Sequence, residues 1–318
     1  MNVKKLIASL LLLFISAVWG GSFVAQTKGG DITGPLSYGF LRFLVAGIAI
    51  LPLIKLIDKN SGIKNSSNTT KKNKKDLFIG GTLCGIFLAG TSAFQQLGLS
   101  MGTSSGKAGF LTACNVIFVP IIGIFFKNKV KFNVWLGVAV TVIGLYFLCI
   151  SGDMSVQISD ILVLICSVMN ASRIIAVDRY MNKADTAKLA CVQFFSASVI
   201  LFVLSLIFEV DNISVWLSTI NQSTVWLSLL YTGVLAGALA FTVQIVAQKQ
   251  INPTVSSILM STESVFAVLA GALIMKDRLT VRELIGCAMV FAALIVSQLS
   301  FDKKSGGKKY ETDNCPSR

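Results

Sequence analysis

The chain has 318 residues, of which 54% are apolar and 14% are charged, and its 28 Lys and Arg outnumber its 15 Asp and Glu. Soluble domains carry roughly 25% charged residues, so the composition favours a protein that lies in a bilayer. The absence of histidine excludes Ser-His-Asp and Cys-His catalytic sites and every His-ligated metal site. The seven cysteines have no CxxC spacing, which indicates packing residues rather than a metal site or a disulfide framework.

The first apolar segment resembles a signal peptide, because Lys4 and Lys5 precede an apolar run from Leu6 to Val18. The run continues through Trp19 to Phe23 without a clear small-x-small cleavage site. We therefore predict an uncleaved first transmembrane helix.

A helix that spans a bilayer needs about 20 mostly apolar residues, with a range of about 17–25. Ten segments of the chain meet this requirement, so the sequence predicts an all-α integral membrane protein with ten transmembrane helices. The predicted helices are Leu6–Gln26, Leu36–Ile57, Leu77–Leu99, Ala108–Phe126, Val134–Ile150, Ile161–Val177, Leu189–Phe208, Thr224–Val246, Val255–Met275 and Leu284–Phe301.

The basic residues lie in short clusters between these segments, which indicates loops beside an anionic lipid leaflet and not a nucleic-acid-binding surface. If the N-terminus is inside, the inner segments hold 21 Lys and Arg and the outer segments hold 5, while Arg42 and Arg173 lie within helices. The outer segment 276–282 is basic and opposes this trend. The positive-inside rule therefore predicts a multi-pass protein of the plasma (inner) membrane with both termini in the cytoplasm.

The chain contains an internal repeat. A shift of 149 residues places the third to fifth predicted helices on the eighth to tenth, with matching helix and loop lengths, and places Gln95 on Gln244. A shift of 151 residues places Leu41-Arg42-Phe43 on Val192-Gln193-Phe194. Each copy has five helices, an odd number, so the second copy must enter the membrane inverted. Inverted repeats are typical of alternating-access transporters, although channels and membrane enzymes also contain repeats.

The repeat divides the chain into two units. The first repeat is predicted at 6–150 and includes a polar cytoplasmic linker at 58–76 that we expect to be mobile. The second repeat is predicted at 159–301, and residues 302–318 form a cytoplasmic tail. The pairs Gly81/Gly85 and Gly233/Gly237 are each four residues apart, which favours close helix packing.

Several short motifs resemble the drug/metabolite transporter superfamily, specifically its EamA-type ten-helix transporters. They are Trp19-Gly20-Gly21-Ser22-Phe23, Leu41-Arg42-Phe43, the run from Ala108 to Pro120, Glu263, and Lys276-Asp277-Arg278-Leu279-Thr280. Two of them depart from the family pattern. The chain has Glu263-Ser264-Val265 where the family usually has Glu-Pro-Val, and Lys276-Asp277 where it usually has Gly-Glu. The resemblance implies a secondary transporter that exports amino acids or related metabolites.

Glu263 and Arg42 are the first candidate substrate-binding residues. Glu263 is the one carboxylate inside a predicted span, where an isolated charge costs roughly 2.5–3.5 kcal/mol. It can bind substrate, carry a proton, or pack the helix through hydrogen bonds to Ser261 or Thr262. Arg42 can hold a substrate carboxylate or extend to the membrane surface. Arg173, near the end of its helix, is interpreted as an interfacial anchor.

Four uncharged residues complete the candidate substrate-binding set: Trp19, Gln95, Asn115 and Gln244. Polar side chains in a membrane prefer the interior of the bundle, where they either line a cavity or join helices. Trp19 can provide an aromatic wall for the substrate or ordinary packing.

The predicted function is a secondary transporter, an exporter of a small polar or amphipathic metabolite such as an amino acid, acting by alternating access. No catalytic residue, metal or cofactor is expected, and no nucleotide-binding motif is present. The expected partners are a small-molecule substrate and the lipid bilayer, with no nucleic acid, and a homodimer is left open. The alternatives are a multidrug exporter of lipophilic compounds and a non-transporting membrane scaffold or sensor.

Overall fold

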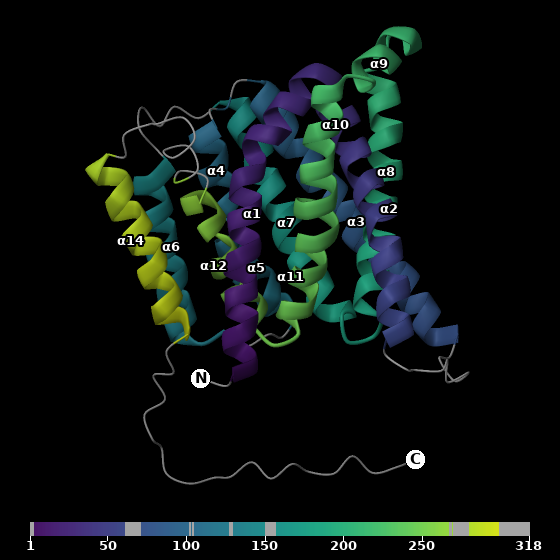
Figure 1. Cartoon of the computed structure of the whole chain (residues 1–318). Coiled ribbons are helices and arrows are strands. Elements are labelled where there is room, and N and C mark those ends of the chain that lie inside the picture. Colours follow the sequence, from purple (N-terminus) through teal and green to yellow (C-terminus); the bar gives the residue numbers. More distant parts are fainter. Residues whose placement is uncertain are drawn as a thin grey trace, which may run out of the picture.

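The structure is a computed structural model that describes residues 3–60, 71–101, 103, 105–126, 130–149, 157–266, 269 and 280–298. The described residues form helices and contain no β-strand. Seven helical stretches within them are long and apolar enough to cross a membrane, and a shorter apolar helix covers Phe132–Phe147. The predicted all-α membrane fold is therefore confirmed (Figure 1).

The helices follow the predicted order and are often longer than the apolar segments that predict them. Residues 61–70 of the predicted linker, the tail and most of the second half of the ninth predicted helix lie outside the described residues, whereas 58–60 and 71–76 of the predicted linker are helical. The first half of the chain has α1 (Val3–Thr33), α2 (Pro35–Asn60), α3 (Lys71–Ser100), α4 (Ser105–Ala113), α5 (Asn115–Phe125) and α6 (Phe132–Cys149). The second half has α7 (Ile158–Tyr180), α8 (Thr186–Phe208), α9 (Ile213–Ile220), α10 (Ser223–Leu229), η1 (Leu230–Leu239), α11 (Ala240–Gln248), α12 (Pro253–Met260) and α14 (Val281–Gln298).

The structure differs from the prediction in several helices. The fourth predicted helix is divided into α4 and α5. The eighth is not a regular α-helix, because the ten-residue π-helix η1 separates α10 from α11. The short helix α9 was not predicted, and the Asn212 side chain caps it by accepting hydrogen bonds from the backbone N–H groups of Ser214 and Val215. A π-helix widens the backbone locally and is frequent at functional sites.

Equivalent helices of the two halves pack against each other. Helix α2 packs against α8, and α6 packs against α14, as Figure 1 shows for α6 and α14. Helix α3 packs against α7 and α8, and the corresponding segment α10–η1–α11 packs in the same way against α1 and α2. In each half, the third predicted helix therefore packs against the first two helices of the other half, as a two-fold relation between the repeats requires.

The paired glycines bring these helices close together, which confirms their packing role. A Cβ atom added at Gly85 would lie 2.5 Å from the Cβ of Ser196 on α8. A Cβ atom added at Gly233 would lie 2.7 Å from Cγ1 of Val45 on α2. Because Gly81 and Gly85 match Gly233 and Gly237 at a shift of 152 residues, these contacts favour 152 over 149 for this part of the repeat.

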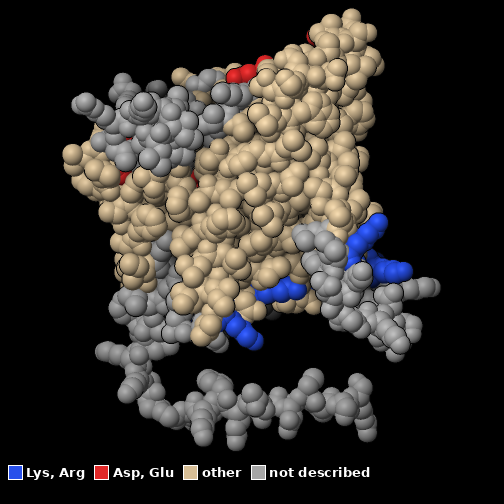
Figure 2. Space-filling model, viewed as in Figure 1, with Lys and Arg blue, Asp and Glu red and all other residues tan. Residues whose placement is uncertain are grey.

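On the face that Figure 2 shows, the described residues at the two ends of the bundle differ in charge. Helix α1 begins and α14 ends at the lower edge of the molecule in Figure 1. Lys and Arg side chains gather at this lower edge in Figure 2, and Asp and Glu lie in the upper part of the same face. The wide band between them is formed by uncharged residues, as expected for a surface that faces lipid.

Candidate functional site

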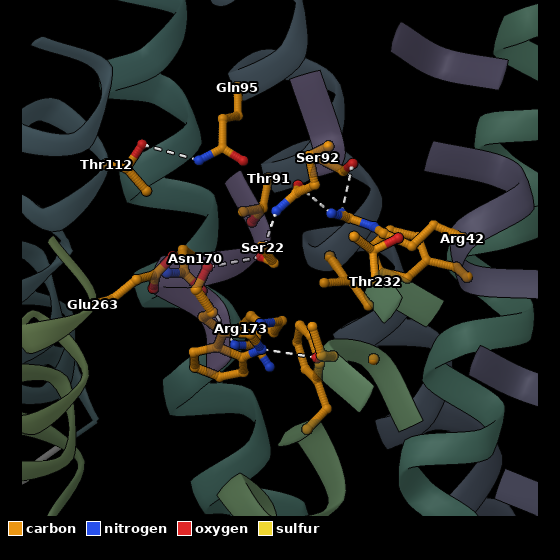
Figure 3. A pocket seen from close by; sticks show the side chains of 17 residues that line it. Ser22, Arg42, Thr91, Ser92, Gln95, Thr112, Asn170, Arg173, Thr232 and Glu263 are labelled. Carbon is orange, nitrogen blue, oxygen red and sulfur yellow. Dashed lines mark hydrogen bonds between the residues drawn. The ribbon is translucent and has the colours of Figure 1, made fainter. Parts of the chain in front are cut away.

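A polar cavity lies between the two halves of the bundle (Figure 3). Its volume is about 100 Å³, several times the space that one water molecule needs. Helices α1, α2, α3 and α4 line it from the first half, and α7, η1, α11 and the segment that carries Glu263 line it from the second. Of the six candidate residues, Trp19, Arg42, Gln95 and Glu263 line this cavity.

Arg42 points into the cavity and not towards the membrane surface. It lies on α2, and its Nη1 donates a hydrogen bond to Oε1 of Gln26 on α1. Its Nη2 donates to Oγ of Ser92 on α3 at 3.2 Å. The guanidinium carbon lies 4.6 Å from the ring centre of Phe43, within range of a cation–π interaction. Three helices of the first half therefore hold this cation in place.

Arg173 also lines the cavity, so its interpretation as an interfacial anchor was wrong. Its side chain is 3% exposed. Nη1 and Nη2 each donate to Oε1 of Gln244 at 3.3 Å, and Nη2 donates to Oδ1 of Asn170 at 3.2 Å. The guanidinium carbon lies 4.9 Å from the ring centre of Phe241. Helix α7 extends to Tyr180, seven residues beyond Arg173, so Arg173 does not lie at the end of its helix.

The repeat contained a signal for Arg173 that the sequence reasoning did not use. The shift of 151 residues that pairs Phe43 with Phe194 also places Arg173 on Ser22 and Asn170 on Trp19. All four of these α1 and α7 residues line the cavity. Equivalent positions of the two repeats thus face the same space.

Glu263 is the one carboxylate among the described residues that line the cavity. The neighbouring hydroxyls do not bind it, because Ser261 Oγ donates to the backbone oxygen of Ser257 at 2.9 Å. Thr262 Oγ1 donates to the backbone oxygen of Leu259 at 2.6 Å. A hydroxyl has one hydrogen to donate, so the packing hypothesis for Glu263 loses the two partners on which it depended.

Trp19 and Gln95 are held in the cavity wall by contacts with neighbouring helices. Trp19 Nε1 donates to the backbone oxygen of Ala236 in η1 at 2.8 Å, and its ring lies 5.1 Å from that of Phe241. Gln95 Nε2 donates to Oγ1 of Thr112 on α4 at 3.3 Å. Part of the surface of each side chain faces the cavity.

Asn115 and Gln244 lie apart from the main cavity. Asn115 lines a smaller cavity of about 40 Å³, which shares Trp19, Arg173 and Glu263 with the larger one. Gln244 lines neither of these two cavities; it is fully buried, and its Nε2 donates to Sδ of Met260 at 3.1 Å. Its Oε1 is occupied by Arg173, so it can act on a ligand only by positioning that guanidinium.

Comparison with known proteins agrees with this architecture. The sequence profile of the EamA-like transporter family matches residues 6–150 and again 157–298, one match for each half. An uncharacterized transporter of Archaeoglobus fulgidus is 29% identical over 304 residues, which cover 94% of this chain and 88% of that protein. The uncharacterized transporter YoaV of Bacillus subtilis is 22% identical over 299 residues, covering 92% and 97% of the two chains.

The fold also occurs among solved structures. One crystal structure superposes with a TM-score of 0.71 at 14% identity and covers 92% of this chain and 96% of its own. At that identity the likeness concerns the fold alone. Because the family profile covers both halves of the sequence, the chain is a member of the EamA-like transporter family.

Proposed function

We propose that the protein is a secondary transporter that exports a small polar or amphipathic metabolite, such as an amino acid, by alternating access. Family membership supports a transporter of small molecules across the bilayer. The observation that carries the proposal is the cavity, which holds charged side chains of both halves inside an apolar bundle. Charged side chains within a membrane protein are rare, and those that face a cavity inside the bundle typically mark substrate or ion pathways.

The arrangement of the halves supports alternating access. Two inverted halves of the same shape can exchange conformations around a site between them, which exposes that site to one side of the membrane and then to the other. The cavity is lined by helices of one chain, so transport as a monomer is compatible with this site, and a homodimer would add copies of it.

The upper end of the bundle joins the two halves through a carboxylate. Glu209, which ends α8, accepts hydrogen bonds from the backbone N–H groups of Leu36 and Ser37 at 2.6 and 2.7 Å. The Ser37 hydroxyl donates to the same carboxylate at 2.6 Å. These groups form the N-terminus of α2, where the helix dipole favours a negative charge. In the proposed cycle, the upper end of the bundle either opens by breaking this contact between α8 and α2, or moves as one unit with the contact intact.

The substrate in this proposal contacts Trp19, Arg42, Gln95 and Glu263 in the main cavity, with Asn115 beside it. Gln244 contributes by holding Arg173. Two guanidinium groups in the lining count against a multidrug exporter of lipophilic cations, because like charges repel.

The orientation in the proposal places both termini in the cytoplasm of the cell that carries the protein in its plasma membrane. The gathering of Lys and Arg at the end where α1 begins supports this orientation. Single cysteines at Ser67 and Asn221 test it with an impermeant maleimide on intact cells. Labelling should occur at Asn221, and labelling at Ser67 would contradict the orientation.

The test of export is a metabolite profile of medium and cytosol in cells that overproduce the protein and in cells that lack it. Export predicts at least one small polar metabolite that rises in the medium on overproduction and accumulates in the cytosol on deletion. Cells producing Arg173→Met at the same membrane abundance serve as the control. Identical profiles in all these cells would favour a scaffold or sensor.

A further inference from the structure

The cavity carries an excess of positive charge. Three of the described residues that line it are charged, the cations Arg42 and Arg173 and the carboxylate Glu263. Charges taken out of water are costly unless partners of opposite sign compensate them. A ligand that fills this cavity is therefore favoured if it brings one net negative charge.

Both guanidinium groups keep hydrogen-bonding capacity. A guanidinium has five N–H donors, and the hydrogen-bond partners of Arg42 and Arg173 are neutral oxygens, from Gln26, Ser92, Asn170 and Gln244. The Nε–H group of each arginine is buried without a hydrogen-bond partner in the part of the chain that the structure describes. Carboxylates are the ligands that match such donors best, because they accept two parallel N–H bonds.

The two cations lie at separate places on one aromatic cluster. Arg42 lies over Phe43 and Arg173 lies over Phe241, while the Phe194 ring lies between these two rings at 6.2 Å and 5.6 Å. Figure 3 shows the guanidinium groups reaching the cavity from different helices, with Glu263 on a third side. Each arginine is thus placed to engage its own anionic group, and Glu263 is placed to engage a cation.

We propose that the substrate of this transporter is an acidic amino acid or a close analogue, with two carboxylates and one ammonium group. Arg42 and Arg173 each bind one carboxylate, and Glu263 binds the ammonium. The ligand then has one net negative charge, which offsets the net charge of the lining. This assignment rests on the proposed transport function and narrows it to a substrate class.

Counterflow by the full-length protein in proteoliposomes tests the assignment. Vesicles loaded with unlabelled L-glutamate are diluted into labelled L-glutamate, and competitors are added outside at equal concentration. L-Aspartate should compete fully. L-Glutamine has the same length and one carboxylate fewer, and should compete roughly tenfold more weakly or worse. Succinate lacks the ammonium group and should also be weaker, and L-lysine and inorganic phosphate should not compete.

Variants assign the effect to the named cations. Arg42→Gln and Arg173→Gln should each reduce the preference for L-glutamate over L-glutamine by roughly tenfold. Arg179→Gln is the matched control, because Arg179 lies on the same helix as Arg173 but is exposed. Arg42→Lys and Arg173→Lys keep the charge and should retain the preference with weaker binding, which separates a loss of charge from a loss of folding.

A thermal-shift measurement on the purified protein with the same compounds separates the proposed substrate class from the proposed transport function. If neutral amino acids exchange as well as L-glutamate, or if succinate outcompetes it, the substrate class is wrong and the transporter stands. If L-glutamate stabilises the protein more than L-glutamine does but nothing exchanges, the site assignment holds and the transport function falls. If no compound binds or exchanges, both are contradicted.

Discussion

Phe43 on α2 and Phe194 on α8 lie with nearly parallel, offset rings, whose centres are 6.2 Å apart at an interplanar angle of 15°. The shift of 151 residues makes them equivalent positions of the two repeats. A residue can touch its own equivalent only close to the axis that relates the two copies. The axis therefore passes beside this pair, and the cavity with Arg42, which lies over Phe43, sits next to it.

The stacked pair should contribute strongly to stability. Phe194 is fully buried among α2, α8 and α11 residues, and Phe194→Ala should destabilise the protein by about 3 kcal/mol because it leaves a cavity that the helices cannot close. Thermal or denaturant unfolding in detergent measures the change. Phe208→Ala is the control, since Phe208 lies on the same helix and is 72% exposed. Equal losses in the two variants would contradict the role of the pair.

The close contact of α3 and α8 should tolerate no side chain at Gly85. A Cβ atom there would lie 2.8 Å from the backbone oxygen of Gln193 as well as 2.5 Å from the Cβ of Ser196, so Gly85→Ala must push the helices apart. We expect a loss of about 1–3 kcal/mol and lower abundance in the membrane. Gly30→Ala is the comparison, because its nearest neighbour, Gln96 Oε1, lies 3.9 Å away. Wild-type abundance of Gly85→Ala would show that the helices are not in close contact.

The Glu209 contact should depend on the negative charge. In Glu209→Gln the amide N–H₂ group meets a backbone N–H group of α2, so one hydrogen bond is replaced by repulsion. The expected loss of stability is about 2 kcal/mol, measured as a lower melting temperature in detergent. Asp211→Asn removes the same charge from an exposed position two residues away and should change little. The prediction fails if both variants, Glu209→Gln and Asp211→Asn, melt at the wild-type temperature.

Glu263 has three roles to separate, and proteoliposomes with an imposed pH gradient distinguish them. Binding of the substrate ammonium predicts that Glu263→Gln loses exchange and gradient-driven transport together, each by roughly tenfold or more. Proton coupling alone predicts that exchange survives while accumulation is lost, and a packing role predicts normal transport by the variant. Asp76→Asn is the control, because Asp76 lies near the start of α3 and outside the cavity lining.

The sequence was sufficient for features that depend on composition along the chain. Apolar runs of spanning length predicted the helices, because a bilayer demands that length directly. Arg42 and Glu263 were identified because charges in such runs are costly and therefore rare.

Features that depend on packing were not predictable in the same way. The π-helix η1 is a backbone adjustment with no residue pattern of its own, and α9 is too short to have a clear period. The shift of 149 residues aligned Gln95 with Gln244, although only Gln95 lines the main cavity. The direction of the Arg173 side chain depends on its hydrogen bonds to Gln244 on the neighbouring helix α11, which is distant in the sequence.

The central claim is that one cavity becomes accessible from both sides of the membrane in turn. A single cysteine at Thr91, which lines the cavity, tests it in a protein whose seven cysteines have been replaced. Right-side-out and inside-out vesicles are treated with an impermeant maleimide, and Ile174→Cys, at a fully buried position, serves as the unlabelled control. The account predicts labelling of Thr91→Cys from both sides, and labelling from one side only, or from neither, would contradict it.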